Sequence, residues 1–159
     1  MAAILVRMFE HHHWANLRTL AAGADLDDAG LDTTVVGTRD SIRETLMHIA
    51  GAEQRYVMRL AKRPPAYDER EGWPGLERLR QLLDESGRLL IDLAGSADPD
   101  EVLRGEYRGE AYALPAALLY VQAISHATEH RSQIATILTQ RGIEPPDVSG
   151  WAWHDAQGS

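Results

Sequence analysis

Two histidines, His126 and His130, lie four residues apart in the stretch "SHATEHR" near the end of the chain. On an α-helix, this spacing places both side chains within about 40° of each other around the helix axis. The same face carries four apolar residues, Leu119, Ala123, Ile134 and Ile137. We therefore expect both imidazoles to point inward, where an unpaired polar group costs about 1–3 kcal/mol. A divalent metal ion would satisfy them, because neutral imidazole is a good ligand; two ordinary histidines with other hydrogen-bond partners are the alternative.

A metal site needs a third protein ligand, and the chain has seven histidines in all. His48 falls about 130° from the centre of the apolar stripe of its helix, so spacing alone favours a surface or boundary position. His12 lies with Asn16 near the middle of an apolar face. It is a candidate ligand, a donor to a ligand, or a core histidine bonded to a carbonyl group. His11 and His13 are expected to face solvent, because three adjacent helical residues fan over about 200°.

Glu53 is the second unusual polar residue, because it interrupts the middle of an apolar helical stripe. One interpretation is a carboxylate that reaches solvent or pairs with a buried arginine. The other is a functional carboxylate, which either orients a ligand histidine or acts as a general base on metal-bound water. The sequence favours neither.

Four long segments with helical periodicity must position these residues. They span about 3–22, from 41 to the prolines at 64 and 65, 75–94 and 115–141. Ser41 and Glu44 have the spacing of a capping box at the start of the second segment. Residues 101–114 contain two glycines and a short alternation, which predicts a small hairpin or an irregular loop. We therefore expect an all-α fold, a four-helix bundle with a short hairpin or loop insertion before the last helix, in a single domain over residues 1–159.

Composition excludes several other classes of function. The 159-residue chain has a net charge of -8, which argues against nucleic acid and anionic membranes as partners. It contains no cysteine, so disulfides and thiolate ligands are excluded and a reducing, cytoplasmic location is expected. No apolar run approaches the roughly 20 residues that span a bilayer, and the N-terminus does not have the pattern of a secretory signal. The tail, residues 143–159, is expected to pack back on the helices because Trp151 and Trp153 are costly to leave in water.

Three stretches together resemble the DinB-like (DinB/YfiT-like) superfamily of bacterial metal-binding four-helix-bundle proteins. They are "HHHWANLRTL", "SIRETLMHIAGAEQRYVMRL" and "HATEHRSQIATILTQRGIEPP", in the order and on the helices that the family has them. The resemblance covers nearly the whole chain. It implies a metal ion, usually zinc or nickel, bound by His48, His126 and His130, and it overrides the doubt about His48. It also implies a homodimer.

Characterised relatives in that superfamily include bacillithiol S-transferases and mycothiol-dependent maleylpyruvate isomerases, so the resemblance implies a metal-dependent enzyme that uses a low-molecular-weight thiol and a small-molecule substrate. A metal-dependent hydrolase is the alternative enzyme, and a non-catalytic metal-binding or small-molecule-binding dimer is the alternative from another class. Glu53 or His12 could accept a proton in catalysis. Arg131 or Arg55 could bind carboxylates of the thiol cofactor.

Overall fold

A computed structural model describes residues 2–98 and 100–158, which are mostly helical with one small antiparallel sheet. The long helices are α1 (Ala2–Ala22), α3 (Ile42–Ala61), α4 (Leu76–Gly95) and α5 (Ala116–Gln140). The shorter elements are α2 (Asp28–Leu31), the 3-10 helix η1 (Glu69–Glu71), α6 (Gly150–Gln157) and the strands β1 (Val102–Tyr107) and β2 (Glu110–Pro115). The four long helices are therefore those that the sequence predicts. The expected all-α class is not strictly correct, because β1 and β2 form a sheet.

Periodicity does not predict the three short helices, because each is shorter than the window in which a helical repeat can be recognised. Their starts are instead marked by side-chain caps, since Asp27, Asp68 and Ser149 each accept a hydrogen bond from a backbone N–H of the first turn. The predicted capping box of α3 is confirmed. Ser41 accepts from the backbone N–H of Glu44, and the Glu44 carboxylate accepts from the backbone N–H of Ser41.

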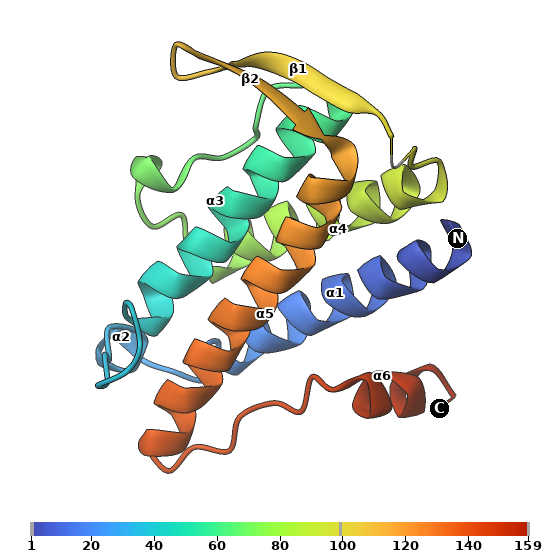
Figure 1. The fold of residues 1–159 in the computed structure, drawn as a ribbon. Coiled ribbons are helices and arrows are strands. Elements are labelled where there is room, and N and C mark those ends of the chain that lie inside the picture. Colours follow the sequence, from blue (N-terminus) through green and yellow to red (C-terminus); the bar gives the residue numbers. More distant parts are fainter. Residues whose placement is uncertain (1, 99, 159) are drawn as a thin grey trace.

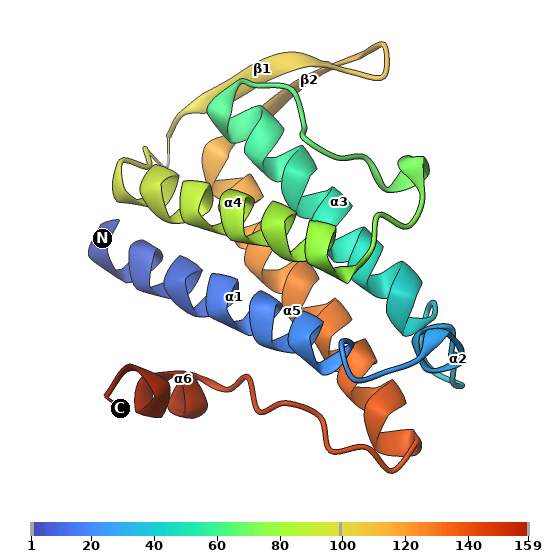
Figure 2. The ribbon, with the colours of Figure 1, turned by 180° about the vertical axis from the view of Figure 1, so that it is seen from behind.

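The four long helices pack as two antiparallel pairs. Figures 1 and 2 show α1 beside α4, while α3 and α5 form a second pair that crosses the first obliquely. Further contacts join α3 to α4 and α1 to α5, so that each long helix has two long neighbours. Among the helices in the described part of the chain, none is both long and apolar enough to cross a membrane.

The buried apolar residues form two clusters rather than one. The first gathers around Leu46, Leu82 and Ile134, and the second gathers around Phe9, Leu90 and Leu119. Each long helix contributes to both clusters and also carries buried polar residues, which on α1, α3 and α4 lie between the two contributions. These polar residues are His12 and Asn16 on α1, Glu53 on α3, Ser86 on α4, and His130 and Arg131 on α5. The core is therefore divided by a polar layer.

The segment before α5 is a hairpin, which confirms the first of the two predicted alternatives, a small hairpin or an irregular loop. Strands β1 and β2 pair in register from Val102 opposite Pro115 to Tyr107 opposite Glu110. Arg108 and Gly109 form the turn, both with positive φ (55° and 82°), as a two-residue hairpin turn requires. The hairpin crosses the end of α3 and the start of α5 (Figure 1), which brings its tyrosines and Arg108 toward the α3–α5 pair.

The C-terminal tail packs back on α1, as expected. The His11 Nε2–H donates to the backbone carbonyl of Val148 at 2.8 Å, and Trp153 of α6 meets the His11 ring edge-on at 5.8 Å between centroids. His11 is therefore half-buried, and the expectation that it faces solvent is wrong. His13 is also half-buried, because it packs against α4 near Asp84. Trp153 of the tail is half-buried against α1, whereas Trp151 is 81% exposed.

Close approach of α1 and α4 depends on Gly87. A Cβ added there would overlap the His13 ring, with Cγ only 2.8 Å away and the His13 Cβ at 3.1 Å. Overpacking of this kind costs about 1–3 kcal/mol. We therefore expect Gly87→Ala to lower the free energy of unfolding in urea, although alanine is the better helix former by about 1 kcal/mol.

The matched control is Gly95→Ala in the same helix, where the nearest atom, Val6 Cγ2, is 3.8 Å from the added Cβ. This variant should be as stable as the wild type or slightly more stable. Adding His13→Ala to Gly87→Ala should restore part of the loss. A Gly87→Ala protein with wild-type stability would contradict this prediction, because the steric cost would then not exceed the helix-forming gain of about 1 kcal/mol.

Candidate metal centre

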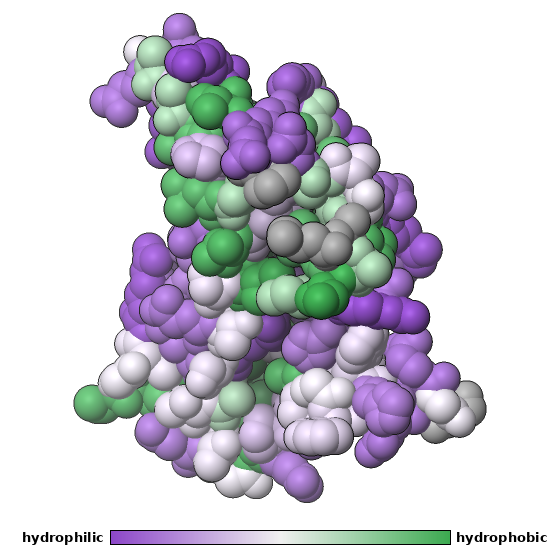
Figure 3. All heavy atoms as spheres, turned by 45° about the vertical axis from the view of Figure 1, so that its right-hand side comes forward, coloured by the Kyte–Doolittle hydropathy of each residue, from purple (hydrophilic) through white to green (hydrophobic). Residues whose placement is uncertain are grey.

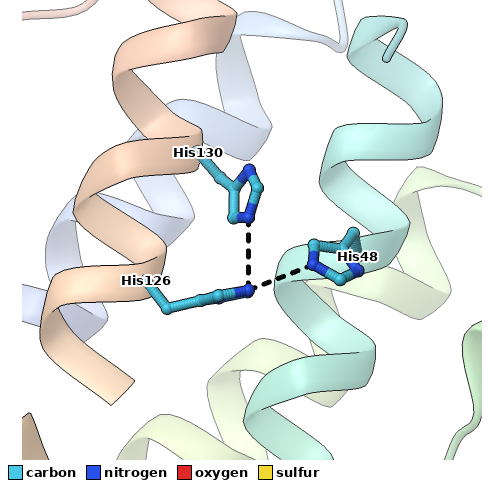
Figure 4. Close-up of side chains that lie close together, drawn as sticks. All are labelled: His48, His126 and His130. Atoms are coloured by element: carbon cyan, nitrogen blue, oxygen red, sulfur yellow. Dashed lines mark hydrogen bonds between the residues drawn. The ribbon is translucent and has the colours of Figure 1, made fainter. Parts of the chain in front are cut away.

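Three histidines from two helices meet between α3 and α5 (Figure 4). His126 Nε2 lies 3.0 Å from His48 Nε2 and 3.2 Å from His130 Nε2. The three candidate ligand atoms all lie within 4.8 Å of one another. One helical turn separates His126 from His130 on α5, and the packing of α3 against α5 brings His48 to them. The structure thus brings together all three residues predicted as metal ligands.

Hydrogen bonds on the far side of two rings fix which nitrogen carries the proton. The His48 Nδ1–H donates to Glu69 Oε2 at 2.7 Å, and the His130 Nδ1–H donates to Gln133 Oε1 at 3.1 Å. In a neutral imidazole the other nitrogen then carries a lone pair and no proton. The Nε2 atoms of His48 and His130 therefore present lone pairs toward His126. A carboxylate or amide that holds the outer N–H of a ligand histidine is the usual support of metal-binding imidazoles.

Burial favours the neutral form of His48 and His126, which is the form that binds a metal ion. Burial lowers the pKa of His126 to about 4, helped by the neighbouring His130 and His48 and by the positive charges of Arg55 and Arg39. Burial also lowers the pKa of His48, although its bond to Glu69 acts in the opposite direction. At neutral pH both rings are therefore uncharged and available as ligands.

The chemistry of this donor set fits a metal ion. Of the three Nε2 atoms, only that of His126 can carry a proton, so the cluster has more acceptors than donors. Among the described residues, the other donor to the cluster is Arg39 Nη1, which lies 3.3 Å from His48 Nε2. Arg39 is an exposed side chain. Two ligands at about 2.0–2.1 Å from a tetrahedral zinc ion are separated by about 3.3–3.4 Å. The observed separations of 3.0 and 3.2 Å are close to that value, so the three residues could hold a divalent metal.

His12 and Glu53 lie in a second, fully buried cluster. Glu53 Oε2 accepts from His12 Nε2–H at 2.8 Å and from Asn16 Nδ2 at 2.9 Å, while Glu53 Oε1 accepts from the Ser86 hydroxyl. Arg131 joins this network by donating to Asn16 Oδ1 at 2.6 Å. Burial lowers the pKa of Arg131 to about 10, which still leaves it charged at neutral pH.

No hydrogen bond or ring contact among the described residues joins His12 or Glu53 to the three histidines. The catalytic roles predicted for His12 and Glu53 therefore stay predictions, and the geometry gives both a structural role. Arg131 is only 5% exposed and its guanidinium already bonds Asn16 and Thr128. Its predicted role in binding a cofactor carboxylate is thus unsupported by this arrangement, whereas Arg55 faces a cavity.

Sequence reasoning missed Glu69, which holds the His48 ring. Glu69 lies in the short η1 segment between α3 and α4, where no periodicity relates it to His48. No local signal identifies this residue, because the contact spans 21 positions and depends on the fold of the connection. Gln133, by contrast, lies three residues after His130 on the same helix, so helical spacing alone could have suggested it.

A cavity of about 450 Å³ lies beside the histidine cluster. Two of its lining residues also touch the cluster: Glu69 bonds His48, and the Tyr56 ring meets the His126 ring edge-on at 6.1 Å between centroids. The rest of the lining comes from α3, α5 and the hairpin. A small molecule in this cavity would therefore be separated from His48 and His126 by the side chains of Glu69 and Tyr56.

Comparison with known protein families agrees with this site. The model of the DinB family matches residues 1–158, and the chain therefore belongs to the DinB family. A comparison with curated protein sequences found no significant match.

The Glu69 contact makes a prediction about metal affinity. Removing the group that accepts a hydrogen bond from the outer N–H of a ligand histidine typically lowers metal affinity by about 10–100-fold. We expect Glu69→Ala to weaken metal binding by roughly 10–100-fold in a competition titration with a chelator.

Glu71→Ala is the matched control, because Glu71 lies in the same η1 segment but bonds the backbone of Asp68 instead of a histidine. It should disturb the connection without changing metal affinity. Equal losses of metal affinity in the two variants would mean that the affinity depends on the fold of the connection between α3 and α4, and not on the Glu69–His48 bond.

Proposed function

We propose that this DinB family protein binds a divalent metal ion through His48, His126 and His130, with the four long helices as the bundle that carries the site. The observation that supports this most directly is the meeting of three imidazole Nε2 atoms, two of them on rings oriented by an outer hydrogen bond. Three protein ligands leave at least one coordination position open, as in catalytic zinc sites. Zinc and nickel are the ions implied by the family, and histidine ligation suits both.

We further propose an enzyme of the thiol S-transferase kind. When bound, the metal ion would lower the pKa of a thiol or a water molecule held at the open position. The chain contains no cysteine, so the sulfur would have to come with a low-molecular-weight thiol such as bacillithiol or mycothiol. Such thiols stay reduced in the cytoplasm, where we propose that the protein acts. The chain's own residues orient the ligand rings through Glu69 and Gln133 and provide the adjoining cavity for a substrate.

Hydrolysis is the second candidate reaction, because water can occupy the same open position. It would need a nearby group to accept a proton, and both oxygens of Glu53 are already engaged by buried donors. Glu53 is therefore not a free base for either reaction, and we place thiol transfer first because the resemblance to thiol-dependent enzymes supports it. The cavity beside the histidines favours either enzyme over a non-catalytic metal-binding protein.

Metal content is the first test. We expect mass spectrometry of tag-free protein, purified without added metal, to find about one ion per chain, as three convergent ligands predict. His48→Ala and His126→Ala should each lose it. The control His154→Ala should keep it, because His154 is exposed on α6. The metal-loaded wild type, and not the stripped protein, should conjugate a low-molecular-weight thiol to a small electrophile.

Each part of the proposal can fail separately. Wild-type protein that takes up no metal, even on reconstitution, would contradict the metal centre. Metal retained in His48→Ala would remove His48 from the ligand set. Metal-dependent hydrolysis without a thiol would favour the second reaction, and metal without any turnover would favour a binding protein.

We also propose that the protein is a homodimer. Large apolar side chains are exposed on two helices that pack against each other, Ile4 and Met8 on α1 and Leu118 and Val121 on α5. Figure 3 shows apolar side chains gathered below the hairpin, at the end of the molecule where α1 begins and α4 ends. Exposed apolar surface of this kind marks protein interfaces.

Light scattering should therefore give the mass of two chains, and Val121→Glu should shift the protein toward the monomer, because a charge is costly in an apolar interface. Val36→Glu is the control, since Val36 is 97% exposed and lies in the connection before α3, away from these helices. A monomeric wild type would end the proposal. A dimer unaffected by Val121→Glu would require another interface.

A further inference from the structure

The cavity beside the three histidines is positively charged, unlike the chain as a whole. Three arginines, Arg55, Arg59 and Arg108, line it together with a single carboxylate, Glu69. The whole chain carries a net charge of -8, so the overall composition does not account for this excess of positive charge. A concave site with charge of one sign concentrates ligands of the opposite sign.

Two of the three arginines, Arg59 and Arg108, stack on aromatic rings of the hairpin. The Arg59 guanidinium lies 4.6 Å from the Tyr107 ring centroid and 5.2 Å from that of Tyr112, so the two strands of the hairpin fix its position. Arg108 at the hairpin turn lies 5.0 Å from the Tyr107 ring. Stacking on aromatic faces leaves the N–H groups of a guanidinium directed along its edge, where they can donate to a ligand.

The positive charges are incompletely neutralised. Within residues 2–98 and 100–158, Arg59 forms no ion pair, and its Nη1 donates only to the backbone carbonyl of Arg55. Arg108 is 3.9 Å from the nearest carboxylate oxygen, that of Asp68. The Arg59 Nε and the Tyr107 hydroxyl are buried without a hydrogen-bond partner. Buried donors without partners are rare and costly in folded proteins, so Arg59 and Tyr107, which line the cavity, retain unused hydrogen-bonding capacity there.

We propose that this cavity binds the anionic group of a small organic substrate, a carboxylate or a phosphate, with Arg59 and Arg108 as its main determinants. The inference rests on the metal centre proposed above, because the cavity adjoins the histidines that would hold the ion. Planar guanidinium groups bind carboxylate and phosphate oxygens through paired, charge-assisted hydrogen bonds. A volume of about 450 Å³ is in the range of small-molecule sites. Arg55 is partly neutralised by Glu69, at 3.3 Å, and contributes less.

The test is calorimetry on the metal-loaded protein with three probes: succinate, its neutral counterpart succinamide, and inorganic phosphate. We expect at least one anion to bind and succinamide not to bind. Arg59→Gln and Arg108→Gln should each weaken anion binding at least about tenfold, through the loss of a charge-assisted bond. The matched control is Arg104→Gln. Arg104 is exposed on β1, three residues before Tyr107, and is not among the residues that line the cavity.

The outcomes separate this proposal from the metal centre. Tighter binding of succinate supports a carboxylate-bearing substrate, and tighter binding of phosphate supports a phosphorylated one. Equal binding of succinamide, or equal losses in Arg104→Gln and Arg108→Gln, overturns the charge-selective site. A protein that holds its metal but binds neither anion also overturns it and leaves the metal centre intact. Anion binding that persists in metal-free His126→Ala supports the cavity even if the metal centre fails. Melting curves check that Arg59→Gln is folded, and Arg108→Gln provides the same test at an exposed position.

Discussion

The buried carboxylate of Glu53 is the constraint on which the rest of the structure depends. Moving an ionised group out of water costs several kcal/mol unless it is paired and hydrogen-bonded. Here the donors come from His12 and Asn16 on α1 and Ser86 on α4, and Asn16 in turn accepts from Arg131 on α5. Every long helix thus supplies one part of the arrangement. A shift of any of them along its axis would leave a buried donor or the carboxylate without its partner, at a cost of about 1–3 kcal/mol per group.

This polar layer also determines where the three histidines meet. Glu53 is five residues after His48 on α3, and Arg131 directly follows His130 on α5. The hydrogen bonds that fix the register of Glu53 and Arg131 therefore fix the height at which His48 faces His126 and His130. A site carried by packed helices is held more accurately than one on loops, which suits the small tolerance of a metal centre. The connection between α3 and α4 adds the last restraint, because its Glu69 holds the His48 ring.

The histidine cluster lies at the boundary between core and surface. His130 is buried, whereas His48 and His126 are half-buried and adjoin a cavity with an excess of arginines. This position reconciles two requirements that usually conflict. Burial keeps His48 and His126 neutral, as their lowered pKa values indicate, and the adjoining cavity has room for a small molecule. Cations beside the cluster, Arg55 and Arg39, act in the same direction, since they disfavour protonation of His126.

The sequence by itself determined the long helices, the capping box at Ser41 and the inward positions of His12 and His130, because all of these follow from local spacing and from the cost of exposing apolar side chains. It also determined the pair His126 and His130, which share one helix face. The spacing of residues could not show that His48 joins them, because His48 lies 78 residues from His126 and outside the centre of its apolar stripe. The family resemblance implied His48, and the packing of α3 against α5 brings it to the other two histidines. The partners of Glu53, the Glu69–His48 bond and the arginine-lined cavity were likewise decided by packing, since each joins side chains from elements far apart in the chain.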